Sequence, residues 1–280
     1  MHMPLLAFVF PALFSLAAIR NATEREPRPH SHSHSHSPSL SFQRHNAAAR
    51  LNYGINDTSP ERSAELHDFW QTHYQPSIHC SNERRLGGDF FNQMDGGKWV
   101  CEPSTLADQG ERCLVYSFGS NNDWTFESAV LNTAPGCEIH TFDPFISAPS
   151  FAPAGVHFHR YGLGHFSLPA PSNDPNLTLT PTSPQLVGLP AIVRALGHEE
   201  RTIELLKVDI EGGEFEGLGG GRWPAVREVE VEVHLMGRWG ERDADLLVGG
   251  IEGRGYRLFH KEENAFGTCC CELAFRMAPR

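Results

Sequence analysis

The chain is poor in positive charge. It has 23 lysines and arginines against 34 aspartates and glutamates, which gives a formal net charge of -11 at pH 7. An anionic surface repels the phosphate backbone of DNA and RNA, so we expect no nucleic acid among its partners or substrates. Hydrophobic residues make up 40% of the 280 residues. The chain is therefore long and apolar enough for one sizeable globular domain with appendages.

The glycine-rich fingerprint of dinucleotide-binding proteins is missing. That fingerprint needs three glycines in the turn after the first strand, whereas the turn Ser117-Phe-Gly-Ser-Asn-Asn-Asp123 has only Gly119. This argues against a nicotinamide or flavin cofactor. The polar residues Ser120, Asn121 and Asn122 could instead hydrogen-bond a nucleoside without phosphates. An ordinary strand-to-helix turn is the alternative.

Charged residues are also absent from the first 19 positions, where an apolar run extends over Leu5–Ile19. A run of about 15 residues is short for a membrane span and typical of a signal peptide. We expect residues 1–20 to be a signal peptide or, because the usual basic n-region is missing, a membrane anchor. Glycosylation sequons at Asn21, Asn56 and Asn176 point the same way. The expected location is the secretory pathway: the lumen of the ER or Golgi, a membrane-anchored form, or a secreted form.

Cysteine spacing typical of a zinc site is missing too. The seven cysteines permit up to three disulfides in an oxidising compartment, with one cysteine left over. We expect a bridge between Cys80 and Cys101. Cys269, Cys270 and Cys271 are consecutive, and consecutive residues of a strand point to opposite faces. At least one of these three is therefore expected to pack in the core.

Residues 21–60 are polar and irregular, and we expect a disordered linker. Within it, histidines alternate with serines and could bind a transition metal loosely; they are His30, His32, His34 and His36. A solvated low-complexity tract is the favoured alternative, because no carboxylate or cysteine nearby completes a defined site.

The domain is expected over residues 61–280. An amphipathic helix is predicted within residues 61–79, and the glycine-rich segments near Arg84 and Asp95 are predicted as turns. The many prolines of residues 165–185 predict a surface insertion.

From Cys113 onward, strands and helices alternate, which predicts a doubly wound α/β sheet. The predicted strands are Cys113–Phe118, Cys137–Phe142, Val156–Tyr161, Ile203–Ile210, Val226–Leu235, Tyr256–His260 and Cys270–Met277, and the predicted helices are Trp124–Leu131, Leu186–Leu196 and Asp243–Glu252.

The stretch Leu205–Phe215 is an apolar run that ends in carboxylates and glycines. It predicts a central strand that is covered on both faces. Asp209 and Glu211 are two residues apart, so they share a face at the carboxyl end of this strand, where open α/β sheets bind ligands. Asp143 ends an earlier strand, at the position where an acid typically binds ribose hydroxyls; a turn-forming role is the alternative.

The strand Val226–Leu235 alternates apolar residues with Glu228, Glu230, Glu232 and His234. If it lies beside the previous strand, four titratable groups face one cleft: Asp209, Glu211, Glu232 and His234. Such a group could supply a general base or bind a hard metal ion. In the alternative, Glu228 and Glu230 are solvated and His234 is a hydrogen-bonded core residue.

Several segments form an ordered set: Asp-Gly-Gly-Lys-Trp-Val-Cys101, Tyr-Ser-Phe-Gly-Ser-Asn-Asn-Asp123, Thr-Phe-Asp-Pro144, Leu-Gly-His198, Leu-Leu-Lys-Val-Asp-Ile-Glu-Gly-Gly-Glu214, Val-Glu-Val-His234 and Cys-Cys-Glu-Leu-Ala-Phe275. From about Cys80 to the C-terminus, this set resembles the methyltransferase-like family related to FkbM-type enzymes. The resemblance implies a Rossmann-like class I S-adenosylmethionine fold, whose seven-stranded, mostly parallel sheet has an antiparallel final strand. Members often enter the secretory pathway, and FkbM-type relatives are mainly O-methyltransferases.

Carried over to this chain, the resemblance implies that Gly119, Ser120, Asn121 and Asn122 hold the methionine part of S-adenosylmethionine and that Asp143 binds the ribose. Asp209 and Glu211 would face the methyl donor and the acceptor. The chain departs from the pattern of most such enzymes in two respects. They have more glycines in the first turn, and an acidic residue where Ser117 stands.

The resulting hypothesis is S-adenosylmethionine-dependent O-methylation of a glycan or a small metabolite. Asp209 or His234 is expected to act as the base, with Glu211 positioning the acceptor; a divalent metal doing the same work is a variant without assigned ligands. The alternative is a non-catalytic luminal binding or scaffold protein on a degenerate methyltransferase fold.

Overall fold

The computed structural model describes residues 59–88, 96–146, 149–164, 185–264 and 267–278. They lie in one compact unit, Gln43–Arg280. The expected signal peptide or anchor, nearly all of the linker with its histidines, and nearly all of the insertion at 165–185 fall outside the described residues. None of the described helices is long and apolar enough to cross a membrane.

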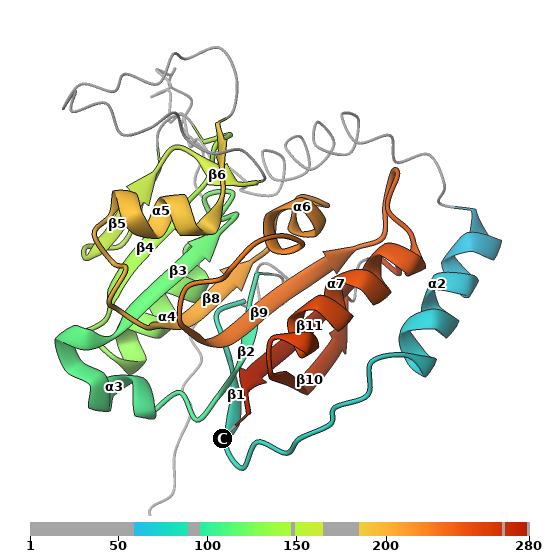
Figure 1. Ribbon diagram of the computed structural model, residues 1–280, viewed down its shortest axis with the longest axis horizontal. Coiled ribbons are helices and arrows are strands. Elements are labelled where there is room, and N and C mark those ends of the chain that lie inside the picture. Colours follow the sequence, from blue (N-terminus) through green and yellow to red (C-terminus); the bar gives the residue numbers. More distant parts are fainter. Residues whose placement is uncertain (1–58, 89–95, 147–148, 165–184, 265–266, 279–280) are drawn as a thin grey trace, which may run out of the picture. The chain divides into compact units, whose positions relative to one another are not determined.

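A seven-stranded sheet forms the centre of the unit, in the order β10-β11-β9-β8-β3-β4-β5 (Figure 1). The pairs from β5 to β9 are parallel, whereas β11 is antiparallel to both of its neighbours. The predicted Rossmann-like class I methyltransferase fold, with its antiparallel final strand, is confirmed. The strands are β3 (Leu114–Phe118), β4 (Glu138–Phe142), β5 (Val156–His159), β8 (Ile203–Val208), β9 (Val226–His234), β10 (Tyr256–Glu263) and β11 (Cys270–Met277).

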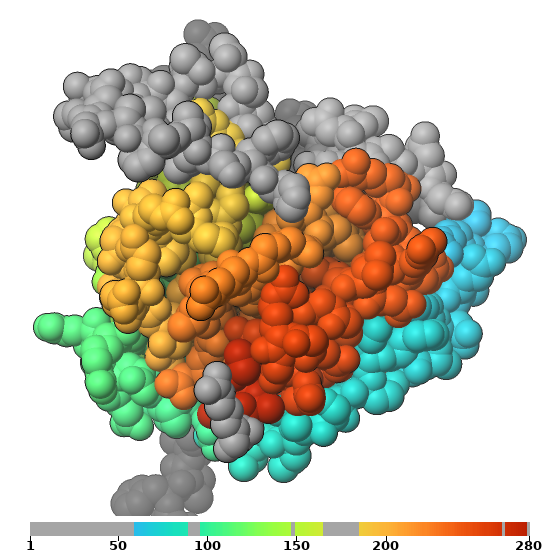
Figure 2. All heavy atoms as spheres, in the orientation of Figure 1, coloured from blue at the N-terminus to red at the C-terminus, as the bar shows by residue number. Residues whose placement is uncertain are grey.

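Helices cover both faces of this sheet, which makes it doubly wound. Alternate residues such as Tyr116 and Val208 pack in the larger core, with residues of α2 (Pro60–Thr72), α5 (Leu189–Ala195), α6 (Glu214–Leu218) and α7 (Glu241–Gly253). The intervening residues, such as Val115 and Leu205, pack on the other face against α3 (Thr105–Gln109) and α4 (Thr125–Thr133). In the space-filling view, α5 to α7 account for much of the yellow and orange surface that faces the viewer (Figure 2).

A two-stranded antiparallel ribbon occupies the region where the sequence predicted only turns. It consists of β1 (Glu83–Leu86) and β2 (Lys98–Cys101), followed after α3 by a short 3-10 turn, Gly110–Arg112. Leu86 and Val100 pack in the smaller core. The prediction was wrong because each strand is four residues long and carries charged residues, so neither gives an apolar run that sequence can reveal.

The region around the predicted insertion also differs in detail. Its flanks pair as two short parallel strands, β6 (Gly162–Leu163) and β7 (Leu186–Val187). The helix predicted from Leu186 therefore begins only at Leu189. Pro190 lies in the first turn of that helix, where proline is tolerated because the first amide groups have no partner within the helix.

Three disulfides form, and one of them is the predicted Cys80–Cys101 bridge. The other two join Cys113 to Cys137 and Cys269 to Cys270. Cys271 is free and buried. This confirms that one of the three consecutive cysteines packs in the core.

Candidate active site at the carboxyl edge of the sheet

The turn after β3 lies directly against the end of β8. Gly119 has a φ of 81°, and a Cβ atom added there would lie 1.7 Å from the carbonyl oxygen of Asp209. The Asp209 N–H donates to the carbonyl of Phe118 at 3.1 Å, and Lys207 Nζ donates to the carbonyl of Gly119 at 2.7 Å. Only glycine combines this φ with so close an approach. The two predicted site elements, Gly119 and Asp209, are therefore neighbours.

Asp143, which follows β4, lies beside the same turn and is 5% exposed. Its Oδ2 accepts from the Asn121 N–H at 2.9 Å, and its Oδ1 accepts from the Phe145 N–H at 2.9 Å. Asn121 and Asn122 both have left-handed φ values, as asparagine tolerates better than most residues. Asp143 thus holds the turn in shape, and its expected role toward a ribose stays a prediction.

Beneath the turn lies a buried polar group that sequence reasoning missed. Glu127, on α4, is 1% exposed; its Oε1 accepts from Thr141 Oγ1 at 3.1 Å, and burial raises its pKa although the charge of Lys207 opposes this. Thr141 pairs in register with Ser117. The helix therefore places a carboxylate close to the position where most members of the resembled family have an acidic residue on the strand.

Polar atoms without partners gather at this turn. Among the described residues, Ser117 Oγ, Ser120 Oγ and Glu127 Oε2 are buried and make no hydrogen bond. A buried polar group without a partner is costly. Ser117 and Glu127 interact with each other, whereas the Ser120 hydroxyl, which belongs to the predicted cofactor turn, is available to a bound ligand.

Lys98 of β2 places a buried positive charge among the predicted acids. It is 1% exposed. Its Nζ lies 3.0 Å from Asp209 Oδ2 and 3.5 Å from Glu232 Oε2, and it also pairs with Glu272. Burial opposes the charge on Lys98, but the three carboxylates outweigh burial and hold its pKa well above the ordinary value. Asp209, Glu232 and Glu272 are close enough together to hold a metal ion, yet the ammonium of Lys98 already supplies a cation to them.

The predicted face of β9 exists, and all of its polar residues are buried. Glu228, Glu230, Glu232 and His234 are each no more than 3% exposed. The alternative in which Glu228 and Glu230 are solvated is therefore wrong. Glu228 Oε1 accepts from the Cys101 N–H at 2.6 Å, and burial raises the pKa of Glu228 to about 7.

His234 lies at the centre of a ring of carboxylates. Its Nδ1 is 3.2 Å from Glu214 Oε1, and its Nε2 is 3.9 Å from an oxygen each of Asp209, Glu211 and Glu232. Burial disfavours the imidazolium, but Glu214 and the other acids raise its pKa well above the ordinary value. The surrounding carboxylates thus favour the protonated imidazole. Glu214, on α6, is a missed partner of His234.

Two acids of this group reach solvent. The side chain of Glu211 is 40% exposed and that of Asp209 is 18% exposed, compared with 4% for His234. Glu211 has a φ of 54°, a strained conformation for a residue with a Cβ atom. Burial opposes the charge on Asp209, but Lys98 and Lys207 lower its pKa below the ordinary value. Asp209, Glu211 and His234 thus lie together, as predicted.

Two surface cavities lie elsewhere. One, of about 430 Å³, is lined by Trp223, Arg254 and neighbouring residues. The other, of about 220 Å³, lies at α6 and α7 and includes Phe215 and Trp239. Gly119, Asp143 and Asp209 line neither of these two cavities.

Comparison with known proteins identifies the family. The family described as "Methyltransferase domain" matches residues 36–276, so the chain belongs to this methyltransferase family. Among solved structures, the mitomycin 7-O-methyltransferase MmcR matches 63% of this chain with 11% identity and a TM-score of 0.24. The match covers 52% of MmcR, about half of its length. No curated protein is significantly similar to this chain.

Proposed function

We propose that this protein is an S-adenosylmethionine-dependent O-methyltransferase of the secretory pathway that acts on a hydroxyl of a glycan or small molecule. Membership of the methyltransferase family supports methyl transfer in general. The observation that carries the proposal is the convergence of the Gly119 turn, Asp143 and Asp209 at one edge of the sheet, where Lys207 and the Asp209 N–H join β8 to the turn. Doubly wound sheets bind ligands at this edge. The FkbM-type relationship stays a prediction.

Two features of the turn support cofactor binding. The unpaired hydroxyl of Ser120 is buried in it, and the left-handed Asn121 and Asn122 beside Asp143 shape it. When bound, S-adenosylmethionine supplies a methyl group on a sulfonium, which needs little further activation. Ser120 would hydrogen-bond the cofactor, and Asp143 would reach the ribose if it released a backbone amide.

The remaining task of the protein is to orient the acceptor hydroxyl and take up its proton. Glu211 is the acid best placed for this, because it is the most exposed of the group. The acids around His234 favour its protonated form, and Lys98 and Lys207 lower the pKa of Asp209, which makes Asp209 a weaker base. We therefore assign the base to Glu211 and the positioning to Asp209 and His234. This reverses the roles expected from the sequence.

Calorimetric titration with S-adenosylmethionine tests the proposal. The wild-type protein should bind the cofactor, and Ser120→Ala should weaken binding about two- to tenfold, the worth of one hydrogen bond. Ser120→Ala removes no hydrogen bond within the described part of the protein, so the fold should persist. Ser128→Ala on α4 makes the same chemical change away from the turn and should bind normally. Folded wild-type protein that binds no cofactor would refute the proposal and favour the non-catalytic scaffold alternative.

The proposed location rests on the disulfides and the sequons. Disulfides persist mainly in oxidising compartments, and three form here. Expression in eukaryotic cells followed by endoglycosidase digestion tests the location. A mobility shift that Asn176→Gln diminishes would support it, and protein without glycans in the cytosolic fraction would contradict it.

A further inference from the structure

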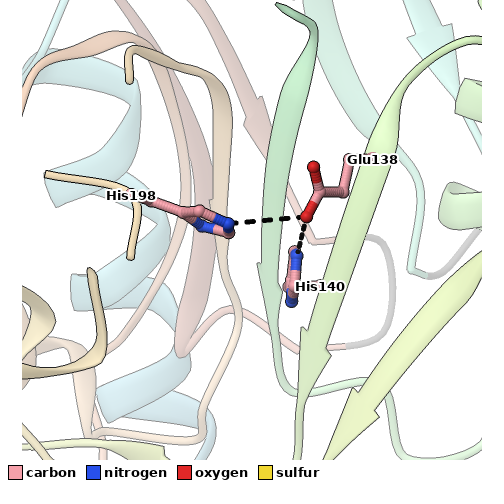
Figure 3. A group of neighbouring side chains, drawn as sticks. All are labelled: Glu138, His140 and His198. Carbon is pink, nitrogen blue, oxygen red and sulfur yellow. Dashed lines mark hydrogen bonds and ion pairs between the residues drawn. The ribbon is translucent and has the colours of Figure 1, made fainter. Parts of the chain in front are cut away.

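A second cluster of titratable side chains lies toward the amino end of β4, whereas the candidate active site lies at the carboxyl ends of the strands. Glu138 and His140 project from β4, and His198 comes from the connection between α5 and β8 (Figure 3). Glu138 is the first residue of β4, whereas Asp143 follows its last. Five residue steps along the strand separate the Cα atoms of Glu138 and Asp143 by about 16 Å, and three steps separate His140 from Asp143 by about 10 Å. The cluster is therefore remote from the candidate active site, and it does not rest on the proposed function.

Both imidazoles present the same nitrogen to one carboxylate oxygen. His140 Nε2 lies 2.8 Å from Glu138 Oε1, and His198 Nε2 lies 3.4 Å from the same oxygen (Figure 3). All three potential ligand atoms lie within 4.8 Å of one another. Ligand atoms about 2.0 to 2.1 Å from a tetrahedral zinc ion are about 3.3 Å apart. The cluster therefore needs only small shifts to enclose such an ion.

The other nitrogen of each imidazole is held by a neighbour. His140 Nδ1 is 2.8 Å from His159 Nε2, and His198 Nδ1 is 2.8 Å from the hydroxyl of Tyr116. If each Nδ1 carries the hydrogen, both Nε2 lone pairs are directed into the cluster. Such outer hydrogen bonds are the usual means of fixing the tautomer and orientation of metal-binding histidines. His140 and His198 are 5% and 7% exposed, so their orientations are further fixed by packing.

We propose that Glu138, His140 and His198 bind a zinc ion that links β4 to the α5–β8 connection. Two imidazoles and one carboxylate suit zinc better than magnesium or calcium, which prefer oxygen ligands. Three protein ligands leave the fourth position for water. Because the cluster lies at the amino end of β4, away from the carboxyl ends of the strands, we assign the ion no part in methyl transfer. Its binding to the folded state raises the stability of the protein.

Arg201 provides a discriminating feature of the site. Its Nη1 pairs with Glu138 Oε2 at 2.5 Å and leaves Oε1 to the histidines. The guanidinium therefore competes with a metal ion for the negative charge of Glu138. Arg201→Met should therefore leave zinc binding intact or strengthen it. If the cluster is only a network of hydrogen bonds and ion pairs without a metal ion, the same change would only weaken that network.

The test uses the full chain with a purification tag free of histidine. The background carries His30→Ser, His32→Ser, His34→Ser and His36→Ser, so that the linker histidines contribute no metal. After chelator treatment, zinc is titrated and metal content is measured by mass spectrometry. Tetrahedral coordination is checked by the visible absorption of Co²⁺ in place of zinc. We expect one tightly bound zinc per chain and a higher Tm with zinc than without it.

Matched variants make the assignment specific. His198→Asn keeps a polar atom near the position of Nδ1 but removes Nε2, and Glu138→Gln keeps the shape without the charge; each should weaken zinc binding at least tenfold. Tyr116→Phe leaves all three ligands in place and should weaken it 10- to 100-fold. It serves as the second variant if His198→Asn does not fold.

His67→Asn provides the control. His67 is an exposed histidine that pairs with Glu263 at 2.8 Å and with no other residue in the described ranges, so its replacement should change zinc affinity less than twofold. Folded background protein that binds no zinc would overturn the proposal. Equal affinities of the background and the His198→Asn variant would overturn it as well.

Discussion

Replacement of Lys98 should reveal how strongly the buried acids depend on this one cation. Lys98→Met keeps the length of the side chain and removes the ammonium that Asp209, Glu232 and Glu272 share. The loss of one partner from a buried ion pair costs about 3 to 5 kcal/mol, because the remaining charge is uncompensated. Domains are typically stable by about 5 to 15 kcal/mol. The variant should therefore retain only a fraction of the stability at pH 7.

The pH dependence of this loss follows from the pKa of each group. In the wild-type protein, the pKa of Asp209 is lower in the folded state than in the unfolded state. Ionised Asp209 therefore stabilises the fold at every pH above the unfolded pKa, and this contribution is lost only in strong acid. Without Lys98, burial is less opposed and raises the pKa of Asp209, and the pKa of Glu272, which burial already raises in the wild type, rises further. The folded variant then takes up protons as the pH falls from 7 to 5. The stability difference between variant and wild type should shrink by about 1.4 kcal/mol per pH unit for each proton.

Urea unfolding followed by tryptophan fluorescence at pH 7, 6 and 5 measures this difference. Lys261→Met is the matched control, because Lys261 Nζ donates to the carbonyl oxygens of Trp70 and His73 and, among the residues that the structure describes, to no carboxylate. It should cost about 1 to 2 kcal/mol, with little change over this pH range. A loss below about 1 kcal/mol in Lys98→Met, or a loss independent of pH, would refute the argument that Lys98 neutralises the buried acids.

Three further predictions concern other parts of the protein. Glu211→Gln should lower methyl transfer from labelled S-adenosylmethionine to a panel of glycans and hydroxylated compounds by a factor of about 10² to 10⁴. Calorimetry should show little change in cofactor binding. Full activity of this variant would exclude Glu211 as the base. Two serine substitutions remove the Cys80–Cys101 bridge, which spans 21 residues. They should lower the free energy of unfolding, measured in urea, by about 3 kcal/mol. An unchanged midpoint would show that the bridge is dispensable. Burial raises the pKa of Glu228 to about 7, so the folded state binds more protons than the unfolded state between about pH 4.5 and 7, and stability should fall as the pH rises through this window. Glu228→Gln should abolish that part of the fall, and an identical pH profile in this variant would contradict the assignment.

The sequence by itself determined the fold and the strands that carry the candidate site. The mostly apolar run before Asp209, which contains Ile203, Leu205, Leu206 and Val208, is typical of a central strand, and the alternation through Glu228, Glu230, Glu232 and His234 is a direct consequence of strand geometry. Asp209, Glu211 and His234 lie together as expected. The predicted strand end was wrong, because β8 ends at Val208 and Glu211 has a φ of 54°, so the turn and not strand alternation positions Glu211.

Only the tertiary structure decided the charges of the site. Lys98 is 111 residues before Asp209 in the chain and contacts it from the β1–β2 ribbon, whose strands are too short to predict. Glu214 contacts His234 from α6. Sequence spacing carries no information about such contacts, yet they determine the pKa of each acid and of the imidazole. The same reason hid the carboxylate of Glu127 and the meeting of Glu138, His140 and His198, because both depend on how a helix or a connection packs against the finished sheet.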